Sequence, residues 1–189
     1  MNFEIITLKK DNITDFASER NVLLTKTKSE WVLFLDSDET ISEGLKKELK
    51  DLEADGRSGF YIFRKNFFLG QNVGTDKILR LARKNSGKWM RSVHETWDIK
   101  GKIGTLEYPI IHNSAKNLHE FIVKINFYTT LHAEQNLKNG KRSNFLKIIF
   151  YPPVKFFQSL LMGRGLVLSM LQSLHSFLSW SKEWNLQKN

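Results

Sequence analysis

The sequence predicts an α/β fold in which a largely parallel central sheet is followed by an amphipathic helical tail. Residues 31–35 (WVLFL) are five bulky apolar residues in a row, which is typical of a strand buried on both faces. Segments with strand and helix patterns alternate along residues 3–139. Beyond residue 145, apolar residues recur at helical spacing. These three observations define the predicted fold class.

The composition bounds the architecture and excludes some chemistry. A chain of 189 residues is one domain, or one domain with an appendage, and we expect a domain over residues 1–140 and a tail over residues 141–189. The 41% hydrophobic content is enough for a core. The chain has no cysteine, which excludes a disulfide framework, a zinc–thiolate site and a thiol nucleophile.

The elements can be placed from periodicity and turn residues. Thr14 or Asp15 is expected to cap the first helix, and Thr40 with Glu43 forms a capping box ahead of the second. The expected strands are 3–8, 31–35, 59–68, 77–84 and 106–111, and the expected helices are about 15–28, 42–54 and 118–139.

Two stretches have a less regular pattern. Residues 88–107 are expected to form a loop that carries Val93-His94-Glu95, followed by a short hairpin around Gly101 and Gly104. In the tail, Tyr151-Pro152-Pro153 is expected to end one segment before the next begins.

An acidic cluster directly follows the predicted central strand. Asp36 and Asp38 are two residues apart, so both side chains can point to the same side. Ligands of open α/β sheets bind beyond the carboxyl ends of the strands, and two carboxylates there are suitable ligands for Mg²⁺ or Mn²⁺. The alternative is that the acids merely end the strand and begin the next helix.

Three further polar groups belong with this pair. His112 ends another predicted strand, where a histidine is more often structural but is also a suitable Mn²⁺ ligand. Glu95 lies in the intervening loop, where a glutamate is normally solvated but, facing a sugar phosphate, can accept a proton. Arg80 is a nearby cation that can face phosphate.

The ordered set of motifs resembles the family 2 glycosyltransferases. The likeness runs through residues 15–21 (DFASERN), 29–39 (SEWVLFLDSDE), 78–81 (ILRL), 93–95 (VHE), 109–112 (PIIH) and 124–129 (KINFYT). Within the family the chain is most similar to the bacterial branch that includes lipopolysaccharide-core β-glucosyltransferases. The basic amphipathic tail also resembles that branch, so the likeness covers nearly the whole chain.

This resemblance implies a GT-A fold and an inverting transfer from a nucleotide-diphosphate sugar, with UDP as the expected nucleotide, to a glycan or glycolipid of the cell envelope. It implies that Asp36 and Asp38 are the metal-binding DxD pair, that His112 is a further metal ligand, and that Glu95 is the catalytic base. Arg20 and Arg80 are assigned to binding of the donor.

The chain also departs from the family pattern. Members of the family begin with a strand, a nucleotide-contacting loop and a second strand that ends in aspartate, and the sequence shows none of these. The resemblance therefore implies a truncated GT-A domain that keeps the metal and acceptor half. It further implies that a separately encoded N-terminal half can be a partner.

Three other functions compete with this hypothesis. Residues 35–40 (LDSDET) match the DxDxT signature of phosphatases with an aspartate nucleophile, but acids after Asp98 are isolated and supply no late acidic pair. Nucleic-acid binding fits the net charge of +9, but the basic residues cluster at one end among apolar runs, so we expect no nucleic acid. A catalytically inactive partner protein that keeps the transferase surface remains an alternative.

The tail concentrates the positive charge. Residues 138–189 contain eight lysines and arginines and one acid, Glu183. Its longest uncharged run, residues 165–181, is short and polar for a transmembrane helix. Helices packed on the domain are one reading of the pattern. The charge favours the other, in which the tail binds an anionic membrane peripherally, on the inner face of the cytoplasmic membrane. The first ten residues do not resemble a signal peptide, which is consistent with a cytoplasmic location.

Overall fold

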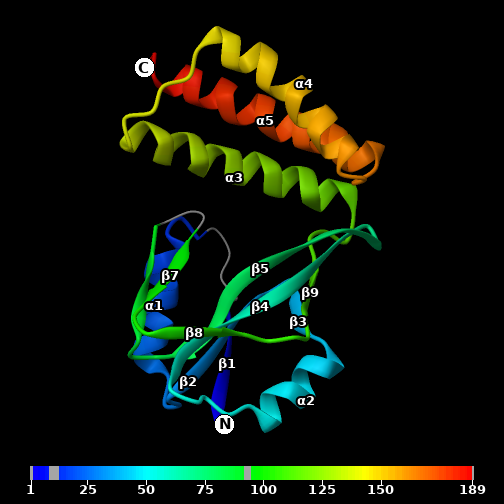
Figure 1. The fold of residues 1–189 in the computed structure, drawn as a ribbon. Coiled ribbons are helices and arrows are strands. Elements are labelled where there is room, and N and C mark those ends of the chain that lie inside the picture. Colours follow the sequence, from blue (N-terminus) through cyan, green and yellow to red (C-terminus); the bar gives the residue numbers. More distant parts are fainter. Residues whose placement is uncertain (1, 9–12, 92–94, 189) are drawn as a thin grey trace. The chain divides into compact units, whose positions relative to one another are not determined.

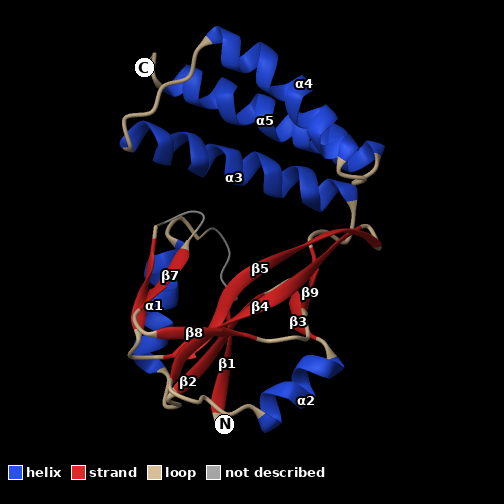
Figure 2. Cartoon of the chain, in the orientation of Figure 1, coloured by secondary structure: helices blue, strands red, loops and turns tan. Residues whose placement is uncertain are grey.

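A computed structural model describes residues 2–8, 13–91 and 95–188 of the chain. Contacts divide it into two compact units, which are treated separately below. Unit 1 comprises residues 1–67 and 74–114, and unit 2 comprises residues 68–73 and 115–189. Most of the main sheet belongs to unit 1, whereas helices α3, α4 and α5 and the β4–β5 turn at residues 68–73 belong to unit 2. Figures 1 and 2 label these strands and helices. The domain boundary expected at residue 140 stays a prediction.

The described strands are β1 (Phe3–Leu8), β2 (Trp31–Asp36), β3 (Glu39–Ile41), β4 (Arg57–Phe68), β5 (Gln71–Arg83), β6 (Gly87–Met90), β7 (Thr96–Ile99), β8 (Lys102–Thr105) and β9 (Ile110–Asn113). The described helices are α1 (Phe16–Lys26), α2 (Glu43–Asp51), α3 (Leu118–Lys138), α4 (Phe145–Leu161) and α5 (Leu166–Leu186).

The main sheet is mixed, so the α/β class is confirmed but the expectation of a largely parallel sheet is wrong. Its strand order is β1-β2-β5-β4-β9-β3, with β8 also beside β4. β1 pairs with β2 in parallel, whereas β2 pairs with β5 and β3 pairs with β9 in antiparallel fashion. The chain reverses its direction between β4 and β5 at Leu69-Gly70. These two residues have positive φ (47° and 80°) and join the strands in a tight hairpin.

The first two helices begin at short polar side chains. Asp15 caps α1 by accepting a hydrogen bond from the backbone N–H of Ser18 (2.9 Å), as predicted. Ser42 caps α2 through the N–H of Leu45 (3.2 Å). The expected capping box at Thr40 is wrong, because Thr40 lies in β3 and pairs with Ile111 of β9.

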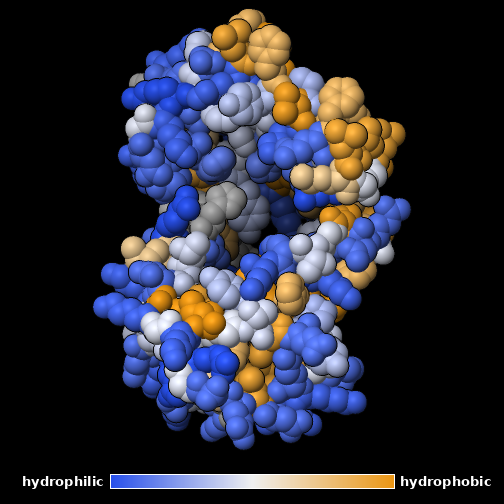
Figure 3. All heavy atoms as spheres, viewed as in Figure 1, coloured by the Kyte–Doolittle hydropathy of each residue, from blue (hydrophilic) through white to orange (hydrophobic). Residues whose placement is uncertain are grey.

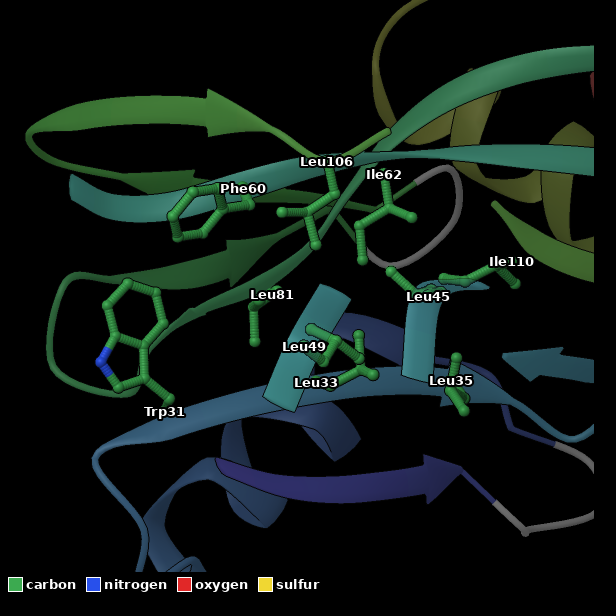
Figure 4. Packing of buried hydrophobic residues seen from close by; sticks show 10 residues of the cluster. All are labelled: Trp31, Leu33, Leu35, Leu45, Leu49, Phe60, Ile62, Leu81, Leu106 and Ile110. Carbon is green, nitrogen blue, oxygen red and sulfur yellow. The ribbon is translucent and has the colours of Figure 1, made fainter. Parts of the chain in front are cut away.

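β2 is buried on both faces, which confirms the prediction from its apolar run. Leu33 and Leu35 on one face belong to a cluster with Leu45 and Leu49 of α2, and Figure 4 shows Leu49 beside Leu33. On the other face, the cluster contains Val32 and Phe34 of β2 together with Ala17 and Leu24 of α1.

The stretch expected to be a loop contains a second small sheet. β6 and β7 pair in antiparallel fashion, with Trp89 opposite Trp97. The two indole rings stack at 5.0 Å, and the ring of Phe34 meets both edge-on. The hairpin expected around Gly101 and Gly104 is also wrong, because β8 pairs in parallel with β4.

The core of unit 2 contains Phe68, Ala115, Ile125 of α3 and Leu168 and Leu171 of α5, and α4 packs against α5. The expected break at Pro152-Pro153 is wrong, because α4 continues through both prolines. Two helical hydrogen bonds are lost there, but packing holds the segment: Pro152 is buried and the rings of Tyr151 and Trp180 meet at 5.0 Å. Among the helices described, none combines the length and the apolar character needed to cross a membrane.

Candidate active site

The acidic cluster forms the turn at the carboxyl end of β2. Asp36 is the last residue of β2, Ser37 and Asp38 make the turn, and Glu39 begins β3. The Glu39 carboxylate accepts a hydrogen bond from the backbone N–H of Asp36 (2.9 Å). The Glu39 side chain is fully buried, so this bond fixes the turn that carries Asp38.

Asp36 is bound by two arginines rather than left open to a ligand. Its Oδ1 is 2.5 Å from Nη2 of Arg20, and its Oδ2 is 2.6 Å from Nη2 of Arg80. Burial raises the pKa of this carboxyl group, but the charges of Arg80 and Arg20 outweigh it and hold the pKa below the ordinary aspartate value. Asp36 is therefore an ionised anchor for the two guanidinium groups.

Arg20 connects the acidic turn to Glu95. Its Nη2 also donates to Oε1 of Glu95 (3.0 Å), so one nitrogen bridges the first aspartate of the pair and the candidate base. The guanidinium carbon lies 4.6 Å from the ring centre of Trp89 and 5.5 Å from that of Phe34. Arg20 is completely buried in this aromatic environment, and its Nε and Nη1 have no hydrogen-bond partner among the described residues.

A second set of ion pairs extends from Glu39. Its Oε1 lies 3.0 Å from Nη1 of Arg64 and 3.4 Å from Nη2 of Arg80. Arg64 also binds Asp76 through two parallel hydrogen bonds (3.0 and 2.5 Å). Burial opposes ionisation of Asp76, but Arg64 outweighs it, so the pKa of Asp76 is lowered.

His112 and Asp38 face each other across the β3–β9 pair. The backbone N–H of Asn113 donates to the carbonyl of Asp38 (3.0 Å), which brings the turn to the end of β9. Nε2 of His112 lies 3.6 Å from Oδ2 of Asp38. The structure thus places these two side chains close together, and their role as metal ligands stays a prediction.

Asn66 sets the orientation of the imidazole. Its amide Nδ2 donates to Asp76 (3.2 Å), which turns its Oδ1 toward Nδ1 of His112 (2.7 Å). Because Oδ1 only accepts, Nδ1 carries the proton, and in the neutral ring the lone pair of Nε2 points to Asp38. Histidines that bind metals are held in this way, with the second ring nitrogen donating to an oxygen acceptor.

These residues fit a divalent cation as a two-ligand site. Asp38 and His112 offer an oxygen and a nitrogen, and Mg²⁺ commonly takes one or two protein ligands, with substrate phosphates and water as the others. Asp36 does not fit as a direct ligand while both of its oxygens bind arginines. Within the described residues, no group of three or more histidine and acidic side chains is arranged to hold a metal.

The charges of the network favour a cation. Among the residues that the structure describes, its carboxylates outnumber its guanidinium groups, because Asp36, Asp38, Glu39, Asp76 and Glu95 are linked to Arg20, Arg64 and Arg80. A bound divalent cation would offset the two excess negative charges. A shallow hollow between α1 and β6 contains none of the predicted site residues.

The structure thus brings Asp36, Asp38, Glu95 and His112 into one region of unit 1, linked through the arginines. Arg20 and Arg80 are buried against carboxylates, so in this structure they position the acids. Val93 and His94 lie outside the described residues. The sequence analysis missed Arg64, Asn66 and Asp76, for which the only available signal was their place on adjacent strands.

Replacing Asn66 with alanine is expected to lower the affinity for Mn²⁺ by about 10–100-fold, because the imidazole loses the acceptor that fixes its tautomer. Titration of the chain with Mn²⁺, followed by electron paramagnetic resonance, measures this affinity. Asn72→Ala, a substitution of the same kind at an exposed position of β5, is the matched control. Equal affinities for the two variants would contradict the role given to Asn66.

The comparisons with known proteins point to one class. The chain is homologous to proteins named glycosyltransferases, in agreement with the resemblance found in its sequence. No family model matches the chain, and the GT-A fold stays a prediction.

Three relatives illustrate the match. The lipopolysaccharide core biosynthesis glycosyltransferase LpsC of Rhizobium meliloti is 28% identical over 184 residues, which is 88% of this chain and 68% of LpsC. An uncharacterized glycosyltransferase of Rickettsia bellii is 24% identical over 92% of the chain and 69% of its own length. One from Rickettsia conorii is 27% identical over 62% of the chain and 49% of its own length. The chain thus matches between about half and two thirds of these relatives.

Proposed function

We propose that the chain takes part in inverting glycosyl transfer from a nucleotide-diphosphate sugar, with UDP as the expected nucleotide, to a hydroxyl of a glycan or glycolipid. One observation carries this proposal: the same nitrogen of Arg20 binds both Asp36 of the acidic turn and Glu95. The homology to glycosyltransferases supports the reaction class, and the name of LpsC supports an acceptor of the lipopolysaccharide type.

Each residue then has a defined part. Asp38 and His112 would hold Mg²⁺ or Mn²⁺, which would offset the charge that develops on the diphosphate leaving group. Glu95 would accept the proton of the attacking hydroxyl on the face opposite the leaving group, which inverts the anomeric configuration. Arg20 would orient the Glu95 carboxylate through their hydrogen bond of 3.0 Å.

The metal and donor sites can be tested together by binding, which does not require turnover. Asp38→Ala is expected to weaken the Mn²⁺-dependent binding of UDP by at least about tenfold, because loss of a ligand costs no less than loss of a supporting residue. Calorimetric titration of UDP with Mn²⁺, and with a chelator instead, measures the effect.

Asp55→Asn provides the control, because Asp55 is exposed and forms a surface ion pair with the nearby Arg57. If Asp38→Ala binds UDP as tightly as this control, the acidic turn is not the metal site. If wild-type protein binds metal and UDP but transfers no sugar, alone or with a candidate N-terminal half added, the inactive-partner alternative is favoured.

A further inference from the structure

In the α4–α5 pair of unit 2, many small side chains are buried and many large apolar side chains are exposed, which is the reverse of the usual arrangement in a water-soluble helix pair. Small residues occupy much of its buried side: Ser159, Ser169, Ser176 and Ser179 are each at most 7% exposed. Pro152 is buried as well. The serine hydroxyls at 169 and 179 are satisfied by carbonyls one turn earlier, at 2.7 and 2.9 Å. Small residues let helices approach closely, which is also the packing used inside membranes.

Many large apolar side chains of the same helices face outward, whereas Leu168 and Leu171 of α5 are buried. Figure 3 shows hydrophobic residues gathered over α4 and the turn into α5. Leu161 is 88% exposed. The other large apolar residues that are more than half exposed here are Phe145, Leu146, Phe150, Val154, Phe157, Met162, Leu166, Val167 and Met170. An exposed apolar surface of this extent is typical of a binding surface.

The charges beside this surface indicate what covers it. Lys147, Lys155 and Arg164 lie among the apolar residues, whereas α4 contains no acid. The one acid of residues 138–188, Glu183, is 1% exposed and bonded to Asn136 at 2.8 Å. The surface therefore combines cations with apolar groups and presents no acid among the described residues. A second copy of the chain would bring like charges together, which is unfavourable.

We propose that α4 and the first two turns of α5 form a membrane-binding surface that lies in the interface of an anionic lipid bilayer. The side chains from Phe145 to Met170 would enter the headgroup–acyl boundary while the lysines and the arginine bind lipid phosphates. No element of this proposal depends on glycosyl transfer, so it can fail or succeed independently of the proposed function.

Because the chain has no cysteine, single labels can be placed at chosen positions. Leu161→Cys carries a polarity-sensitive NBD fluorophore, and Val123→Cys on α3 is the control, since Val123 is also exposed (54%) but lies outside the surface. With vesicles of phosphatidylcholine and phosphatidylglycerol, the label at 161 is expected to shift to the blue and brighten, whereas the label at 123 is not. With phosphatidylcholine alone, the shift at 161 is expected to be much weaker.

The charge contribution is tested by flotation of unlabelled protein with the same vesicles. Lys155→Glu is expected to lower the partition coefficient by about thirtyfold, because it removes one favourable charge and adds an unfavourable one. Lys50→Glu, the same change on α2, is the control. Equal binding to neutral and anionic vesicles overturns the electrostatic part. The proposal is overturned if the label at 161 shifts to the blue without lipid, if that shift rises with protein concentration, and if sedimentation equilibrium shows dimers. These results would assign the surface to a second copy of the chain.

Discussion

Replacement of Glu95 by glutamine is expected to lower the rate of sugar transfer by about 10²–10⁴-fold while donor affinity stays nearly unchanged. Glutamine keeps the size of the side chain and an oxygen that can accept from Nη2 of Arg20. It cannot take the proton of the attacking hydroxyl at neutral pH. The initial rate at saturating donor and acceptor measures the effect, with the chain alone and with a candidate N-terminal half added.

Glu53→Gln, at an exposed position after α2, is the matched control and should leave the rate unchanged. Full turnover in Glu95→Gln would place the base at another residue. A parallel loss of donor affinity would instead indicate that Glu95 acts through Arg20 on the acidic turn. The two results separate a proton acceptor from a residue that only stabilises the site.

The fold was predictable where local pattern decides it. The run at residues 31–35 contains no polar residue, and only a strand covered on both faces suits it. The direction of β5 depends on the two residues of one turn, which a strand pattern does not encode. β6 was missed because Gly87–Met90 has a single buried apolar residue, Trp89, whose partner Trp97 lies on β7.

The part of the candidate site that is local in the sequence was predictable, and the part that depends on contacts between strands was not. Asp36 and Asp38 lie together in sequence, so their spacing alone indicates a common role. The sequence cannot tell which anion an arginine meets, and Arg20 and Arg80 meet Asp36 where phosphate was expected. Asn66 has no local signal, because its role arises from Asp76 on one neighbouring strand and His112 on the other.

The tail illustrates a different limit. Helical spacing of the apolar residues predicted helices here, but in the structure Met170 and Phe177 are exposed, whereas Ser169 and Ser176 are buried together with Leu168 and Leu171. Periodicity does not decide which face turns inward. In unit 2 the small face contributes to the packing, because small side chains allow the α4 and α5 backbones to approach closely.

Replacement of Arg20 by methionine is expected to lower the free energy of unfolding by about 2–3 kcal/mol. Breaking a buried ion pair typically costs about 3–5 kcal/mol, and the lower value applies because the Asp36 carboxylate is 31% exposed and keeps Arg80. Methionine fills a similar volume beside Trp89. The loss of stability therefore measures the effect of leaving the carboxylates of Asp36 and Glu95 without Arg20. Urea denaturation, followed by the fluorescence of the buried tryptophans, measures the change.

Arg57→Met is the control, because Arg57 pairs at the surface with Asp55 and its loss should cost less than about 1 kcal/mol. Arg20→Lys keeps the charge but cannot bridge two carboxylates from a planar group, so it should recover only part of the stability. If Arg20→Met lowers the free energy of unfolding by no more than Arg57→Met does, the ion pairs of Arg20 with Asp36 and Glu95 contribute little to stability. In that case the acidic turn is held by Glu39 and Arg80 alone, and the link from Arg20 to Glu95 does not position the base.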